Sequence, residues 1–123
     1  MEQDTVGVRF ARAMASKDFE AIRALMDAEV DFRGLPPNRT WEAGNPSDLI
    51  SSVLRQWFED SDEIESLESV ETDSFSDRER VGYRFRGRNE DGPFVVEQQA
   101  FLASEDGRIT WMRVVCSGFR PAD

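Results

Sequence analysis

Residues 79–116 read ERVGYRFRGRNEDGPFVVEQQAFLASEDGRITWMRVVC, and apolar and polar side chains alternate through most of this segment. The alternation is typical of β-strands and covers residues 79–88, 93–104 and 108–116. The runs are separated by Asn89-Glu90-Asp91-Gly92-Pro93 and by Asp106-Gly107. Asp-Gly is a hairpin signal, because such a turn needs positive φ at both central positions. The segment therefore predicts three long antiparallel strands joined by two hairpins.

The N-terminal half carries apolar side chains at helical spacing. A first helix is expected after a cap at Asp4 or Thr5, and a second after a cap at Asp18. A third begins at Asn45-Pro46, with Asn as the cap and Pro at the first helical position. The apolar stripes of the three helices are Val6, Phe10 and Met14; Phe19, Ile22, Leu25 and Met26; and Leu49, Ile50, Val53, Leu54, Trp57 and Phe58.

Two further segments complete the chain. Val30 and Phe32 alternate with charged neighbours and predict a short strand, followed by a loop over residues 34–38. Residues 59–79 hold ten acidic residues and a single arginine. We interpret this acidic segment as a solvated, bulged edge strand or loop, in which like charges deter pairing with another chain. A cation site is the alternative.

Composition excludes several classes of protein. At 123 residues the chain is expected to form one domain, residues 1–123. The net charge of −10 argues against binding to nucleic acid or to an anionic membrane. No apolar run is long enough to span a membrane, no signal peptide is visible, and the single cysteine, Cys116, favours the cytoplasm. The sequence contains no histidine, which excludes histidine bases and histidine metal ligands, so no metal or cofactor is expected.

The order of elements resembles the nuclear transport factor 2-like superfamily, particularly its SnoaL-like and ketosteroid-isomerase-like branches. The resemblance rests on residues 19–26 leading to residues 28–32, and on Asp106-Gly107-Arg108-Ile109 leading into the last strand. It implies an α+β fold of the cystatin-like type: a cone-shaped, curved mixed or antiparallel sheet wrapped by three N-terminal helices. It also implies an apolar pocket inside the cone and a homodimer formed through the outer face of the sheet.

Isomerase-like members of this superfamily use a tyrosine, a protonated acid and a carboxylate base. In the positions that the resemblance assigns to these groups, this sequence has Phe10, Gln99 and either Phe32 or Asp31. Phenylalanine and glutamine cannot perform those proton transfers, and Asp31 would point to the opposite face of its strand. The resemblance therefore does not imply isomerase chemistry of that kind here.

The resemblance places one set of strand residues inside the cone, in which Arg84 lies beside Glu97 and Gln99 across the hairpin. The full inward set is Gly82, Arg84, Arg86, Val95, Glu97, Gln99, Phe101, Thr110, Met112, Val114 and Cys116. The opposite register stays open. It would turn Val81, Tyr83, Phe85, Val96 and Gln98 inward and place the arginines in solvent or in a dimer interface.

The three tryptophans have different expected environments. Trp57 lies on the apolar stripe of the third helix, and Trp41 lies in the loop before that helix, at the mouth of the pocket or anchored on a helix. Trp111 alternates with Met112 and should face away from the pocket, into a subunit interface.

Three functions are compatible with these features. The first is binding of a small, largely apolar molecule by Phe10, Phe32, Trp41, Trp57, Arg84, Glu97, Gln99, Phe101 and Met112. The second is a hydrolase, isomerase or cyclase whose catalytic candidates are Glu97, Arg84 and Asp31. The third is a dimeric interaction module with a filled interior.

Overall fold

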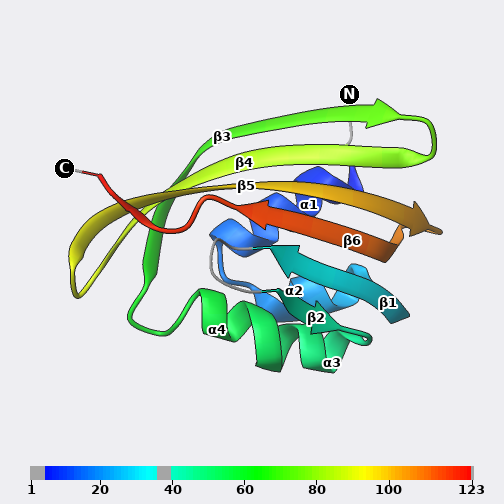
Figure 1. Cartoon of the computed structure of the whole chain (residues 1–123), viewed down its shortest axis with the longest axis horizontal. Coiled ribbons are helices and arrows are strands. Elements are labelled where there is room, and N and C mark those ends of the chain that lie inside the picture. The colour runs from blue at the N-terminus through cyan, green and yellow to red at the C-terminus, as the bar shows by residue number, and fades with distance from the viewer. Residues whose placement is uncertain (1–4, 36–39, 123) are drawn as a thin grey trace.

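A computed structural model describes residues 5–35 and 40–122 of the chain (Figure 1). Seven strands form one mixed sheet, in which β2-β1-β6-β5-β4-β3 are successive neighbours and β7 pairs with β5. Helices cover one face of this bent sheet, which we call the inner face, and the opposite face is the outer face (Figure 1). The predicted α+β cone is confirmed.

The four-strand meander is formed by β3 (Glu63–Phe75), β4 (Arg78–Asn89), β5 (Gly92–Glu105) and β6 (Arg108–Cys116). At the second predicted turn Asp106 and Gly107 both have positive φ, 54° and 79°, as expected for this hairpin. The first turn differs from the prediction. Asn89 pairs with Gly92, so Glu90 and Asp91 form the loop, and only Gly92 has positive φ.

The three predicted helices are present and begin at the predicted caps. α1 (Val6–Ala15) begins after Thr5, whose hydroxyl accepts the N–H of Val8, and α2 (Phe19–Ala24) begins after Asp18. The third helix is made of α3 (Pro46–Asp48), the π-helical segment η1 (Leu49–Leu54) and α4 (Arg55–Trp57). Asn45 caps it by accepting the N–H of Asp48. Met26 was expected on the second helix but is the first residue of β1.

β1 (Met26–Leu35) is longer than the predicted strand and runs parallel to β6. Gly34 and Leu35, predicted as loop, are paired with β6; residues 36–38 of that loop lie outside the described residues. β2 (Trp41–Ala43) pairs with β1, so Trp41 begins a short strand where the sequence predicted a loop. β7 (Arg120–Pro121) closes the C-terminal segment onto β5.

The acidic segment forms the edge strand β3, with register shifts between Ile64 and Ser66 and between Leu67 and Ser69. The prediction of a bulged, solvated edge strand is confirmed, and these bulges and charges protect the edge. Lys17, which lies between α1 and α2, donates from Nζ to the carbonyls of Glu59 and Asp62 in the loop before β3. The described residues contain no group of three or more Asp, Glu or Cys side chains placed to hold a metal ion.

The register that the resemblance implied for β4 and β5 is wrong, and the opposite register is present. The buried side chains of these strands are Val81, Tyr83, Phe85, Phe94, Val96, Gln98, Ala100 and Leu102. Burying this apolar set instead of Arg84, Arg86 and Glu97 avoids desolvating three charges. On β6, Met112 and Val114 are buried as predicted, but a bulge between Ala103 and Ser104 places Ile109 in the core instead of Thr110.

The described part of the chain contains no helix that combines the length and the apolar character needed to cross a membrane.

Candidate functional site

Arg84, Glu97 and Gln99 lie together, as the hairpin register predicts, but on the outer face. Arg84 donates from Nε and Nη2 to Glu97 Oε1, over 3.0 and 2.8 Å. Both side chains are 48% exposed. The hydrogen bond to Glu97 raises the pKa of the Arg84 guanidinium. The predicted pairing is therefore confirmed, whereas the predicted location inside the cone is wrong.

The other outer-face candidates lie toward the opposite end of the sheet. Asp31 forms an ion pair with Arg113, with 3.3 Å between Asp31 Oδ1 and Arg113 Nη1. Phe101 is opposite Arg113 in the β5–β6 pairing. Asp31 on β1 is opposite Trp111 on β6, and Trp111 is in turn opposite Ala103 on β5. Ala103 is six residues along β5 from Glu97. Six residues of strand correspond to about 20 Å. Asp31 and Glu97 therefore do not converge on one point, and the two acids cannot act on the same bond.

A row of polar side chains crosses the inner face. Tyr83 on β4, Gln98 on β5 and Cys116 on β6 are directly opposite one another in the register. Tyr83 Oη donates to Gln98 Oε1 over 2.7 Å, and each residue is 1% exposed. Burial raises the pKa of the Tyr83 phenol well above its ordinary value, and the neighbouring Cys116 adds to the rise. The phenol of Tyr83 is therefore neutral at physiological pH.

A hollow of about 290 Å³ lies beside the C-terminal end of β6. It is lined by Glu97, Gln98, Gln99, Val115, Cys116 and Ser117. Gln98 and Cys116 belong to the inner-face row, whereas Gln99 and Val115 face outward. The hollow thus connects the surface with one end of the row. On its inner side a small molecule would meet Gln98 and Cys116, whose neighbours on the inner face are apolar.

The apolar residues predicted for the pocket lie in two places. Phe10, Phe32 and Met112 are at most 1% exposed and belong to the continuous core beneath the sheet. The Phe10 ring lies edge-on to the ring of Tyr83, with 6.3 Å between centroids. Within the described residues these side chains pack the interior.

Trp57 and Trp41 extend that core toward β1 and β2. The ring centroids of Trp57 lie 5.9 Å from Phe32 and 6.5 Å from Trp41. A Cβ on Gly34 would lie within 2.5 Å of the Trp57 ring, so the indole packs directly on the β1 backbone. Both tryptophans are half-buried. Trp57 therefore packs at the edge of the core, as expected, and Trp41 packs against the ring of Trp57 from the start of β2.

Sequence reasoning that followed the resemblance missed the row of Tyr83, Gln98 and Cys116. The signal was available, because Val81, Tyr83 and Phe85 form the more apolar set on the middle strand. In the correct register it is Gln98, one residue before the expected Gln99, that faces the interior alongside Phe10 and Phe32.

No known family profile and no curated protein matches this sequence. Solved structures do match. A protein provisionally described as an isomerase from Rhodopseudomonas palustris has a TM-score of 0.74 and 19% identity, over 94% of this chain and 91% of that one. A protein from Catenulispora acidiphila with a ketosteroid isomerase-like fold, in complex with trimethylamine, has a TM-score of 0.68 and 13% identity, over 95% and 88%. The chain has a nuclear transport factor 2-like fold.

An LEH-like epoxide hydrolase from M. tuberculosis also has a similar fold, with a TM-score of 0.65 and 12% identity over 91% of this chain and 80% of that one. Identities in this range establish the common fold. The chemistry of this chain has to be argued from its own residues.

Proposed function

We propose that the protein binds a small, neutral, largely apolar molecule in the hollow at the end of β6. The observation that supports this proposal is the row of Tyr83, Gln98 and Cys116, which brings hydrogen-bonding groups to the edge of an apolar interior. Apart from Tyr83, Gln98 is one of two buried polar side chains among the described residues; the other, Asp62, is bonded to Asn89 and to the backbone of Glu59.

The chemistry of the row defines the ligand class. Gln98 Oε1 accepts one hydrogen bond from Tyr83, and a carboxamide oxygen can accept a second while its nitrogen has two hydrogens to donate. The row contains no charged side chain, and the charged residue that lines the hollow, Glu97, is already paired with Arg84, so a ketone, alcohol or amide fits the site better than an ion. The volume of about 290 Å³ is near the lower end for small-molecule sites. The ligand is therefore expected to be smaller than a typical drug.

Replacing Gln98 with Leu tests the proposal, and Gln56→Leu is the matched control, because Gln56 is an exposed glutamine on α4 that does not line the hollow. Ligands come from a panel of neutral cyclic ketones and alcohols, and their binding is measured by isothermal titration calorimetry with folding checked by circular dichroism. Gln98→Leu is expected to weaken binding by about 10-fold or more, since it removes a hydrogen bond in a desolvated site. Gln56→Leu should change it less than about threefold.

Two outcomes would refute the proposal. One is that no member of the neutral panel binds. The other is that Gln98→Leu, shown to be folded, binds as the unaltered protein does. Tyr83→Phe provides a second variant, which keeps the ring in the core and removes the donor to Gln98.

The proposal does not include catalysis. The candidates Glu97, Arg84 and Asp31 face outward, and the positions of the two acids are offset by about 20 Å along the strands. Of the three, only Glu97 lines the hollow at the end of β6, and it has no second acid beside it there. We also propose the cytoplasm as the location, on the basis of the single free cysteine.

A homodimer formed through the outer face is the second part of the proposal. Trp111 stands on this face between the guanidinium groups of Arg78 and Arg113, at 4.4 and 4.5 Å from its ring centroid. Farther along the same face, Val115 and Leu35 are opposite each other in the β1–β6 pairing and are 46% and 43% exposed. The face carries charges of both signs, so a second copy turned by a two-fold axis can meet it with opposite charges.

The dimer is tested by size-exclusion chromatography with light scattering. The unaltered chain is expected at twice the mass of 14.1 kDa. Trp111→Glu should be a monomer, because it places a carboxylate at the centre of the interface. Ser51→Glu, which adds the same charge to the exposed side of a helix, should remain a dimer. A monomeric unaltered chain at high concentration would exclude the dimer.

A further inference from the structure

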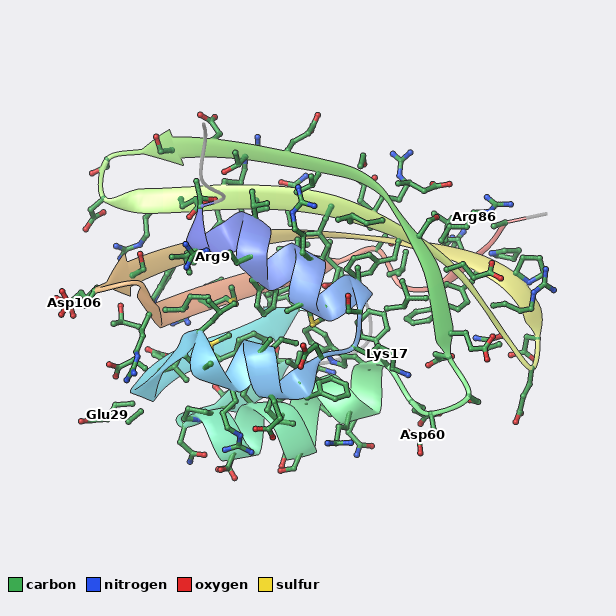
Figure 2. The ribbon with its side chains drawn as sticks, turned by 180° about the vertical axis from the view of Figure 1, so that it is seen from behind. Arg9, Lys17, Glu29, Asp60, Arg86 and Asp106 are labelled. Carbon is green, nitrogen blue, oxygen red and sulfur yellow. The ribbon has the colours of Figure 1, made fainter. Side chains whose placement is uncertain are left out.

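A second and larger hollow, of about 520 Å³, lies on the outer face where β3, β4 and β5 meet the C-terminal segment. Figure 2 shows its Arg86 at the end of the sheet remote from Asp106, close to the C-terminus. We call it the arginine hollow. Its lining residues are Glu68, Arg84, Arg86, Val95, Glu97, Ser117, Arg120 and Ala122.

Three arginine side chains line the arginine hollow, and they differ in the groups that hold their guanidinium ends. Arg84 is held by Glu97 Oε1. Arg86 donates from Nη2 to the carbonyl of Ala122 over 3.0 Å, with Glu68 3.9 Å from its Nη1. Arg120, which is opposite Val95 in the β5–β7 pairing, has no ionic or hydrogen-bonding partner among the described residues.

The charge balance of the hollow is opposite to that of the chain. Three arginines face two carboxylates there, whereas the whole chain has a net charge of −10. The Arg84–Glu97 pair is 48% exposed on both sides, and exposed pairs of this kind are weakly held. Each guanidinium has five N–H donors, of which Arg84 directs those of Nε and Nη2 to Glu97. Donors therefore remain for an incoming anion.

We propose that the arginine hollow binds a small molecule bearing a carboxylate or phosphate group. The planar fork of arginine matches both groups with two parallel hydrogen bonds. Arg120 supplies an uncompensated charge, and Arg84 and Arg86 supply donors whose positions are set by Glu97 and by the Ala122 carbonyl. The volume is within the range of small-molecule sites. A long polyanion such as nucleic acid is disfavoured by the negative charge of the rest of the chain.

The ligand probes are inorganic phosphate and succinate, titrated by calorimetry at constant low ionic strength. Saturable binding of at least one is expected, and comparison of the two identifies which group the hollow prefers. Arg120→Ala should weaken that binding 10-fold or more, and Arg120→Lys should restore part of it, since lysine keeps the charge but not the fork. Arg108→Ala is the matched control, because Arg108 is an exposed arginine at the opposite end of β6.

The proposal is overturned if neither probe binds saturably, or if Arg120→Ala binds as the unaltered protein does. It is also overturned if Arg108→Ala loses as much affinity, which would indicate a general charge effect. Arg120 makes no hydrogen bond or ion pair among the described residues, so its loss should not change the midpoint of thermal unfolding. Gln98→Leu should bind the anion normally, which separates this site from the neutral-ligand site at the end of β6.

Discussion

Phe85→Ala is expected to lower the free energy of unfolding by about 3–5 kcal/mol, the range found when a buried aromatic ring is removed from a core. Phe85 is fully buried, with ring centroids 5.8 Å from Phe58 and 5.1 Å from Tyr83. The neighbouring Arg84→Ala should cost far less than Phe85→Ala, because it removes one half-exposed ion pair. Urea unfolding followed by tryptophan fluorescence measures both values.

This pair of variants determines which face of β4 is buried. In the register that the resemblance implied, Phe85 would be outside and Arg84 inside, and the order of the two effects would be reversed. A large loss for Arg84→Ala with a small one for Phe85→Ala would therefore contradict the inner face described above. Two small losses would indicate that this half of the sheet is not packed on the helices.

The strands and most of the turns could be predicted because their signals are local. Alternation gave the bounds of β6 as residues 108–116, and Asp106-Gly107 supplied the two positive φ values of its hairpin. Helix caps are equally local, and Thr5, Asp18 and Asn45 occupy the predicted positions. In each case the physical cause lies within a few residues of the feature.

The face of each strand could not be predicted in this way, because it depends on how an entire strand packs. A shift of one residue exchanges the two faces. Transferring positions from the resemblance favoured Gln99 and Arg84, whereas the apolar content of Val81, Tyr83 and Phe85 favoured the opposite face. Burial of apolar area determined the outcome. For predicting which face of these strands is buried, counting the apolar residues on each face is therefore more reliable than transferring site positions from the resembled superfamily.

The two hollows depend on contacts between distant parts of the chain, so no local pattern of residues indicates them. The arginine hollow exists because the C-terminal segment returns to β5 and places Arg120 opposite Val95. Glu68 enters it through a bulge in β3, which displaces the alternation on that strand. Neither the return nor the position of the bulge has a local signature in the sequence.

Alkaline pH is expected to destabilise the protein through Tyr83. Burial raises the pKa of this phenol in the native state, whereas in the unfolded chain it titrates near 10. Above pH 10 the unfolded state therefore binds fewer protons than the native state, and stability falls as pH rises. The loss is about 1.4 kcal/mol for each pH unit until the native pKa is reached. Tyr83 is the single tyrosine, so tyrosinate absorbance near 295 nm reports this group alone.

The expected result is that tyrosinate appears together with unfolding, and not in a separate step near pH 10. Tyr83→Phe isolates the contribution, because every other ionisable group is the same in the two proteins. Its stability should decline less steeply above pH 10, although it starts lower, since Gln98 Oε1 loses its buried donor. Ionisation near pH 10 with the native fold intact would show that water reaches the phenol. The inner-face row would then be solvated, and the neutral ligand proposed for it would have to compete with that water.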